Sequence, residues 1–175
     1  MNPSCLFLLL LAVSTDTAKD PAPINDRVRP LDAWASETLE RGVDQSQLVR
    51  DLIEALQKTD VIVLLETTSS LPQELGGTMR LLVVAGGYRY VRVSIARTLL
   101  PATRAAMLGH ELQHVLELAQ SQATDAETLR KLYESIGYRV AGLEGYYETR
   151  AAAAAGRRVW VELHSRQRPD ARAKR

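Results

Sequence analysis

The chain has 175 residues, 46% of them hydrophobic, and its 22 basic and 21 acidic side chains leave a net charge of +1. This length and composition predict a single globular domain with its own core, and the near-neutral charge argues against a nucleic-acid partner. Arginine outnumbers lysine by 18 to 4, and the one dense basic run, residues 166–175, is predicted to be a disordered tail.

The N-terminus has the pattern of an export signal. Residues 5–13 form an unbroken apolar run, which matches the hydrophobic region of a signal peptide and is too short to cross a bilayer. Ala12-Val13-Ser14 provides a cleavage site and Asp16-Thr17-Ala18 a poorer one, although no Lys or Arg precedes the run. We therefore interpret residues 1–18 as a signal peptide and expect a secreted or periplasmic protein without a transmembrane span. The mature chain would then lack Cys5, its only cysteine, so no thiolate could bind a metal.

Residues 19–43 contain three prolines and are predicted to be an irregular lead-in, so the folded domain is expected to span residues 44–165. Asp44 can cap a helix that runs to about residue 58 with one apolar face. Residues 61–66 are nearly all apolar and rich in β-branched side chains, which predicts a buried strand followed by a loop at residues 67–77.

Two further strands are predicted at residues 78–85 and 88–96, because the pair Gly86-Gly87 between them is typical of a hairpin with a two-residue turn. Pro101 can begin the next helix, since the first helical position needs no N–H.

That helix contains the most informative segment, His-Glu-Leu-Gln-His at residues 110–114. Residues four apart share a helix face, so His110 and His114 can bind one metal ion through their imidazoles. Glu111 would lie beside the ion, where it can reach the attacking water without being a ligand. The apolar residues lie on roughly the opposite side of the helix and should pack on a core, namely Ala105, Leu108, Leu112, Val115, Leu116 and Ala119.

Two more helices are expected after it. Residues 124–127, Thr-Asp-Ala-Glu, predict the N-terminal cap of a helix that Gly137 should end. An alanine-rich helix is predicted from about Tyr146, with Gly156 as a candidate end. Residues 159–163 fit either its continuation or a last strand.

Residues 107–116 resemble the active-site helix of the zincin metallopeptidases. The resemblance implies one zinc ion per chain, His110 and His114 as ligands, and Glu111 as general base and proton shuttle. The metzincin subclass would require Gly at position 117 and His at position 120. This chain has Glu117 and Gln120, which excludes that subclass.

A catalytic zinc site needs a third protein ligand, and the candidates downstream are Glu148, Glu144 and His164. We favour Glu148, because it opens the predicted alanine-rich helix, whose small side chains would let that helix lie close to the histidines. A glutamate in this setting resembles the third ligand of the glutamate-type zincins, the gluzincins. Several of those enzymes carry an aspartate four residues later that supports a histidine. Here that position is Ala152, so the orienting partner of each imidazole is not identified.

The order of elements predicts an α+β fold, in which a small antiparallel sheet with a hairpin packs on the motif helix and further helices follow. This order also resembles the zincin layout, in which an edge strand of the sheet pairs with the substrate backbone. Residues 88–96 are the expected edge strand, with Tyr90, Arg92 and Ser94 on one face. A tyrosine hydroxyl or an arginine is suitable chemistry for the oxyanion donor. Tyr146, Tyr147 and Arg150 lie near Glu148 in the chain, with a packing or surface role as the alternative for each.

The sequence thus predicts a secreted zinc metallopeptidase that acts on peptides or proteins. Two other interpretations stay open. The chain could be a zincin-like module that binds metal or a partner without cleaving it, or an interaction domain in which the motif helix is only structural. Zinc content and peptide digestion separate the three.

Overall fold

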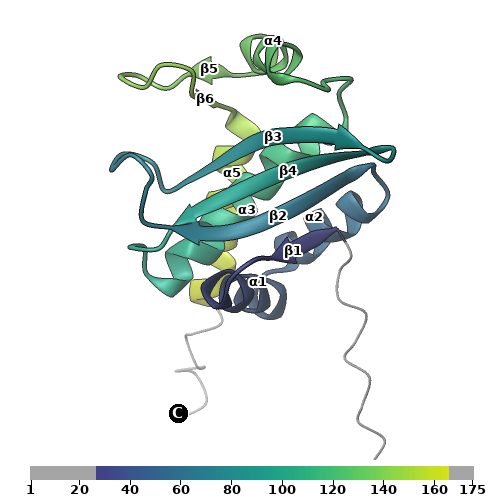
Figure 1. Ribbon diagram of the computed structural model, residues 1–175. Coiled ribbons are helices and arrows are strands. Elements are labelled where there is room, and N and C mark those ends of the chain that lie inside the picture. Colours follow the sequence, from purple (N-terminus) through teal and green to yellow (C-terminus); the bar gives the residue numbers. More distant parts are fainter. Residues whose placement is uncertain (1–26, 166–175) are drawn as a thin grey trace, which may run out of the picture.

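A computed structural model describes residues 27–165 of the chain (Figure 1). The predicted signal peptide at residues 1–18 and the predicted basic tail at residues 166–175 lie outside this range, so both stay predictions. Within residues 27–165, no helix is both long and apolar enough to cross a membrane.

The described residues form an α+β fold with a mixed four-stranded sheet and a small two-stranded sheet. In chain order the strands are β1 (Val28–Pro30), β2 (Val61–Thr68), β3 (Gly77–Ala85), β4 (Tyr88–Ala96), β5 (Tyr138–Arg139) and β6 (Tyr147–Glu148). The helices are α1 (Ala33–Gln45), α2 (Gln47–Gln57), α3 (Pro101–Ala119), α4 (Ala126–Ile136) and α5 (Arg150–Ser165).

The large sheet has the order β1-β2-β4-β3, with β1 and β4 both parallel to β2. The prediction of a purely antiparallel sheet is therefore wrong. The loop after β2 carries the chain past the position of β4, so β3 forms on the outside and the hairpin returns β4 into the gap beside β2 (Figure 1). The hairpin itself is confirmed, and Gly86 and Gly87 both have positive φ angles, 60° and 79°, as a two-residue turn of this kind requires.

The position of β4 corrects the predicted substrate strand. Residues 88–96 are hydrogen-bonded on both sides, to β2 and to β3, so they have no free edge. The free edge on this side of the sheet belongs to β3. Any extended peptide that adds to the sheet next to the motif helix must therefore pair with β3.

The predicted lead-in is also partly wrong, because its second half forms β1 and α1. The Asp32 carboxylate caps α1 by accepting from Ala35 N–H, and it also accepts from the backbone N–H and the hydroxyl of Thr67 at the end of β2. Ser46, not Asp44, caps α2, and Asp44 belongs to the last turn of α1. The prolines of this segment led to the prediction of an irregular structure, but the segment contains α1, whose cap Asp32 is hydrogen-bonded to Thr67 of the sheet.

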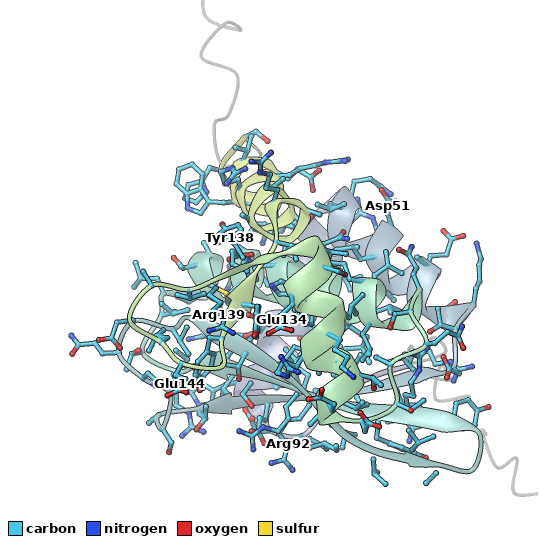
Figure 2. The ribbon with its side chains drawn as sticks, turned by 90° about the horizontal axis from the view of Figure 1, so that it is seen from above. Asp51, Arg92, Glu134, Tyr138, Arg139 and Glu144 are labelled. Carbon is cyan, nitrogen blue, oxygen red and sulfur yellow. The ribbon has the colours of Figure 1, made fainter. Side chains whose placement is uncertain are left out.

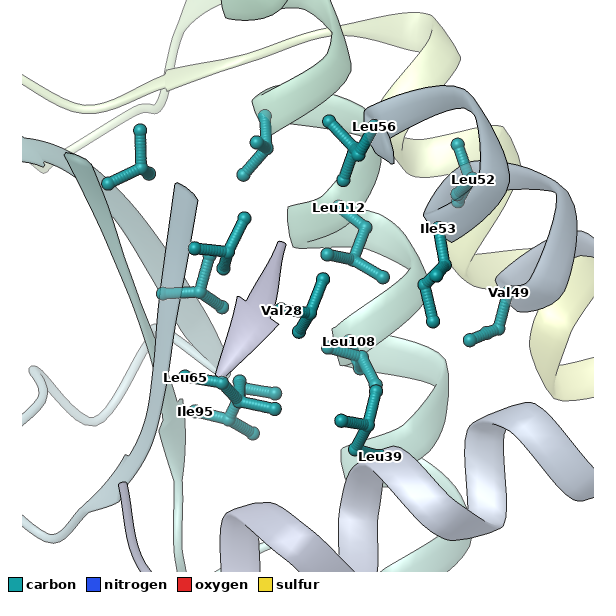
Figure 3. Close-up of a cluster of buried hydrophobic side chains, with 14 of the residues drawn as sticks. Val28, Leu39, Val49, Leu52, Ile53, Leu56, Leu65, Ile95, Leu108 and Leu112 are labelled. Carbon is teal, nitrogen blue, oxygen red and sulfur yellow. The ribbon is translucent and has the colours of Figure 1, made fainter. Parts of the chain in front are cut away.

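The core lies between the sheet and the helices, with α3 at its centre (Figure 3). Leu108 and Leu112 are fully buried on α3, between Leu65 and Ile95 of the sheet and the apolar face of α2. The other side of α3 packs against α5. The predicted apolar face of the motif helix is thus confirmed as a core face, but the histidine face is covered as well.

Candidate metal centre

Two glycines let α5 lie directly on the histidine face of α3. A Cβ atom at Gly109 would clash with the side chain of Val159, and one at Gly156 would lie 3.2 Å from Cβ of His110. Gly156 is therefore an interior residue of α5 that allows close contact, and the prediction that it ends the helix is wrong. Residues 159–163 continue α5, which resolves the alternative left open by the sequence.

The structure brings His110, His114 and Glu148 together. Nε2 of His110 lies 3.4 Å from Oε2 of Glu148, and Nε2 of His114 lies 3.6 Å from Oε1. The two histidines come from adjacent turns of α3. Glu148 comes from β6, two residues before α5 begins, so the prediction that it opens the helix is wrong although its side chain reaches the histidines.

This donor set fits a metal ion. One ligand atom from each of the three residues lies within 4.8 Å of the others. Tetrahedral ligands at about 2.0–2.2 Å from zinc are roughly 3.3–3.6 Å apart, close to the two distances between Glu148 and the histidines. Two imidazoles and one carboxylate leave a fourth position open, which is the arrangement of catalytic zinc sites.

Glu117 is a functional candidate that the sequence analysis missed. Nδ1–H of His114 donates to Oε2 of Glu117 over 3.0 Å, and Nε2 of the same ring faces Glu148. Burial lowers the pKa of His114, but the carboxylates of Glu117 and Glu148 outweigh it and raise the pKa to about 9. The sequence could have indicated this role, because Glu117 follows His114 by three positions and residues three apart in a helix lie on the same face.

The remaining ligands have pKa values that suit metal binding. Burial lowers the pKa of His110, and the nearby His114 lowers it further. Burial raises the pKa of Glu148, but its hydrogen bond to His114 and the charge of His110 outweigh this effect, and the net pKa is lowered. An unprotonated imidazole and an ionised carboxylate are the forms that bind metal.

Glu111 is 3% exposed, and its carboxylate lies against Gly77, the first residue of β3. A Cβ atom at Gly77 would come within 2.7 Å of Oε1 of Glu111, so only glycine leaves room for this carboxylate. Burial raises the pKa of Glu111 to about 7. A carboxylate with a pKa near neutrality can both accept and return a proton.

A cleft of about 490 Å³ opens onto these residues. One wall is β3 with the preceding Leu75, and the other is α4 with the β5–β6 hairpin. The wall residues other than the motif are mostly apolar or aromatic and include Leu75, Met79, Leu81, Leu129, Tyr133 and Val140. Asp125 is the N-cap of α4 and forms a capping box with Thr128, one residue later than the predicted pair of Thr124 and Glu127, and the helix stops at Gly137 as predicted.

The other predicted site residues divide between the cleft and the surface. Tyr146 and Tyr147 line the cleft, whereas Arg150 is exposed outside it. Glu144 is exposed on the loop between β5 and β6 (Figure 2). His164 stacks on Trp160 with ring centroids 3.9 Å apart and bonds to the carbonyl of that residue. Neither Glu144 nor His164 belongs to the ligand group, so Glu148 is the one candidate third ligand that joins the histidines.

Side chains of the predicted substrate strand do not form the cleft. Arg92 lies on the open face of the sheet, 3.8 Å from Glu66, and Ser94 donates a hydrogen bond to the same glutamate. Figure 2 shows Arg92 on this outer face. Comparison of the chain with protein-family models, with curated proteins and with solved structures found no match.

Proposed function

We propose that this protein is a zinc-dependent peptidase of the gluzincin type, with His110, His114 and Glu148 as ligands and Glu111 as general base. The observation that carries the proposal is the buried Glu111 carboxylate beside the three-ligand group, at a cleft bordered by a free strand edge. A site that only stores or transports a metal has no need of such a carboxylate. The zincin-like fold and the secreted location are parts of the same proposal.

Zinc, when bound, would act as a Lewis acid that activates a water molecule and polarises the scissile carbonyl. Glu111 accepts the proton of the attacking water, for which its raised pKa suits it, and returns the proton to the nitrogen of the leaving amine. The burial of Glu111 next to Gly77 restricts its carboxylate to the floor of the cleft. One buried group thus performs both proton transfers.

The substrate would lie along β3. The backbone groups on the free edge of β3 can pair with an extended peptide, and the apolar walls from Met79 and Leu129 can take a large apolar side chain. Tyr133 and Tyr147 already donate their hydroxyls, to the carbonyl of His114 and to Glu134. Among the described tyrosines of the cleft, Tyr146 makes no hydrogen bond through its hydroxyl, so we assign it as the oxyanion donor.

The test combines metal content with digestion. The wild-type protein, residues 19–175, should bind one zinc per chain and cleave a mixed peptide library, and a chelator should abolish cleavage. The variant Glu111→Gln should bind zinc equally well and cleave at least 100-fold more slowly, because general-base catalysis contributes about 10²–10⁴-fold. Glu144→Gln is the matched control, since it removes an exposed carboxylate from the β5–β6 loop and should cleave as fast as wild type.

Two results would contradict the proposal. Equal cleavage by Glu111→Gln and wild type would exclude Glu111 as the base. Stoichiometric zinc without cleavage of any peptide would identify a metal-binding module instead of an enzyme.

A further inference from the structure

We infer that Glu117 and Thr149 form a clamp that holds the second and third metal ligands in one arrangement before the metal binds. Neither residue belongs to the ligand group, and the inference rests on the metal site proposed above. The clamp connects α3, which carries His114, to the junction of β6 and α5, which carries Glu148.

Both carboxylate oxygens of Glu117 are used. Oε2 accepts from Nδ1–H of His114 over 3.0 Å, and Oε1 accepts from the hydroxyl of Thr149 over 2.7 Å. The Glu117 side chain is 9% exposed, so little water competes for either bond. Hydrogen bonds to an ionised group in such a setting are among the stronger ones in proteins. Glu117 therefore fixes the ring orientation of His114 and the position of Thr149 together.

Thr149 transmits this constraint to the third ligand. Its backbone N–H donates to Oε1 of Glu148 over 2.7 Å, and its hydroxyl accepts from the N–H of Ala152 in the first turn of α5. Thr149 is 3% exposed. The residue directly after the third ligand is thus bonded to that ligand, to the helix that follows and to Glu117 of α3.

The third ligand needs such an anchor because its own strand provides little. β6 has two residues and pairs only with the two residues of β5. The loop between them turns through Gly142 and Gly145, which both have a φ of 79° and have open space around them. Without a tie to α3, the ordering of Glu148 would oppose metal binding entropically. The clamp removes that cost in advance.

The measurement is the zinc dissociation constant, obtained by competition with a chromophoric chelator. Thr149→Val keeps the shape of the side chain and removes the hydroxyl, and we expect it to weaken zinc binding about 10–100-fold, the usual effect of removing an outer-shell partner. Glu117→Ala should weaken it by a similar factor. The double variant should lose less than the product of the two effects, because both act through the same carboxylate. Thr149→Ser should bind zinc within about twofold of wild type.

The matched control is Ser46→Ala. Ser46 is a fully buried helix cap like Thr149, but it caps α2 and its hydroxyl bonds to Glu162, away from the ligand group. This variant should lower the melting temperature and leave zinc affinity unchanged. Glu117→Ala leaves the cap of α5 in place, so it carries the test if Thr149→Val does not fold. The visible spectrum of the cobalt(II) form gives a second readout, and it should differ from wild type in both clamp variants at saturating cobalt.

The clamp is supported if the two variants weaken zinc binding while Thr149→Ser and Ser46→Ala do not. It is overturned, with the metal site intact, if the wild type binds zinc and Thr149→Val binds it equally well, whatever happens to the melting temperature. A wild type that binds no zinc overturns the clamp and the proposed function together.

Discussion

The carboxylate of Glu111 and the α-carbon of Gly77 are in such close contact that a β-methyl group at Gly77 would come within 2.7 Å of Oε1 of Glu111. The same methyl would lie 2.8 Å from Cγ of Met107. We predict that Gly77→Ala displaces the Glu111 carboxylate and slows cleavage about 10–100-fold, which corresponds to about 1.4–2.7 kcal/mol in the barrier. Zinc affinity should stay within about twofold of wild type, because the atoms nearest to this methyl group belong to Glu111 and Met107 and not to a ligand.

Gly76→Ala is the matched control for that substitution. Its methyl group would meet the Cε and Sδ atoms at the free end of Met107, which can move aside. Steady-state kinetics on one peptide substrate should therefore show a large loss for Gly77→Ala and a small one for Gly76→Ala. Equal rates for the two variants would mean that Glu111 is not confined by β3.

The contact between α3 and α5 yields a second prediction. A methyl group at Gly109 would overlap Val159, so Gly109→Ala should lower the free energy of unfolding by about 1–3 kcal/mol. Val159→Ala should cost about 1–2 kcal/mol through lost burial. In the double variant the smaller residue makes room for the new methyl, so the loss should be less than the sum of the two. Urea denaturation of the four metal-free proteins measures this, and strict additivity would exclude the contact.

Much of the fold follows from local signals in the sequence. Gly86-Gly87 predicts the hairpin because few other residue pairs adopt positive φ at both turn positions. Pro101 and Gly137 mark a helix start and a helix end through backbone chemistry alone. The motif spacing predicts that His110 and His114 share a face, which helical geometry guarantees once the helix forms.

Local sequence patterns do not predict how distant segments are arranged in space. Whether β4 forms an edge depends on the side of the sheet to which the loop after β2 crosses, and no local pattern encodes that choice. Glu148 reaches the histidines from a two-residue strand, which is too short to leave a periodic signal. Glu117 is the exception, because its spacing from His114 is visible in the sequence, although its second bond to Thr149 is not.

A third prediction concerns the C-terminal end of α3. The side chain of Arg89 is 6% exposed, and its guanidinium donates to both oxygens of Asp60 and to the backbone carbonyls of Leu118, Ala119, Ser121 and Ala123. Arg89→Met should lower the free energy of unfolding by about 2–4 kcal/mol, because it leaves several carbonyls without a donor. Thermal or urea unfolding measures the loss, and a change below about 1 kcal/mol would show that water replaces the guanidinium.

The ion pair between Arg89 and Asp60 predicts that stability depends on pH. The hydrogen bond from Arg89, with its charge, holds the pKa of Asp60 below its ordinary value of 3.8. A lowered pKa in the folded state means that this group stabilises the fold above about pH 3.8 and loses its effect as the pH falls through the folded pKa. The stability difference between wild type and Asp60→Asn should therefore be constant from pH 7 to 5 and shrink toward pH 3.

The last prediction concerns removal of the metal. The helix α4 has one buried residue, Tyr133, whose ring packs edge-on against that of His114 with centroids 5.4 Å apart and whose hydroxyl donates to the carbonyl of His114. The end of the segment from α4 to β6 is held by Glu148, which faces the two histidines, and by the bond from the adjacent Thr149 to Glu117. A bound ion would add a strong bond at that end, so a chelator should increase local opening throughout residues 126–148. Hydrogen exchange measured by mass spectrometry should then show faster uptake in this segment and unchanged uptake in α1 and α2.

The variant Glu148→Ala should exchange at the fast rate with or without zinc, since it lacks the anchoring ligand. If the chelator leaves exchange of residues 126–148 unaltered in the wild type, the metal adds no anchor to this segment beyond the clamp.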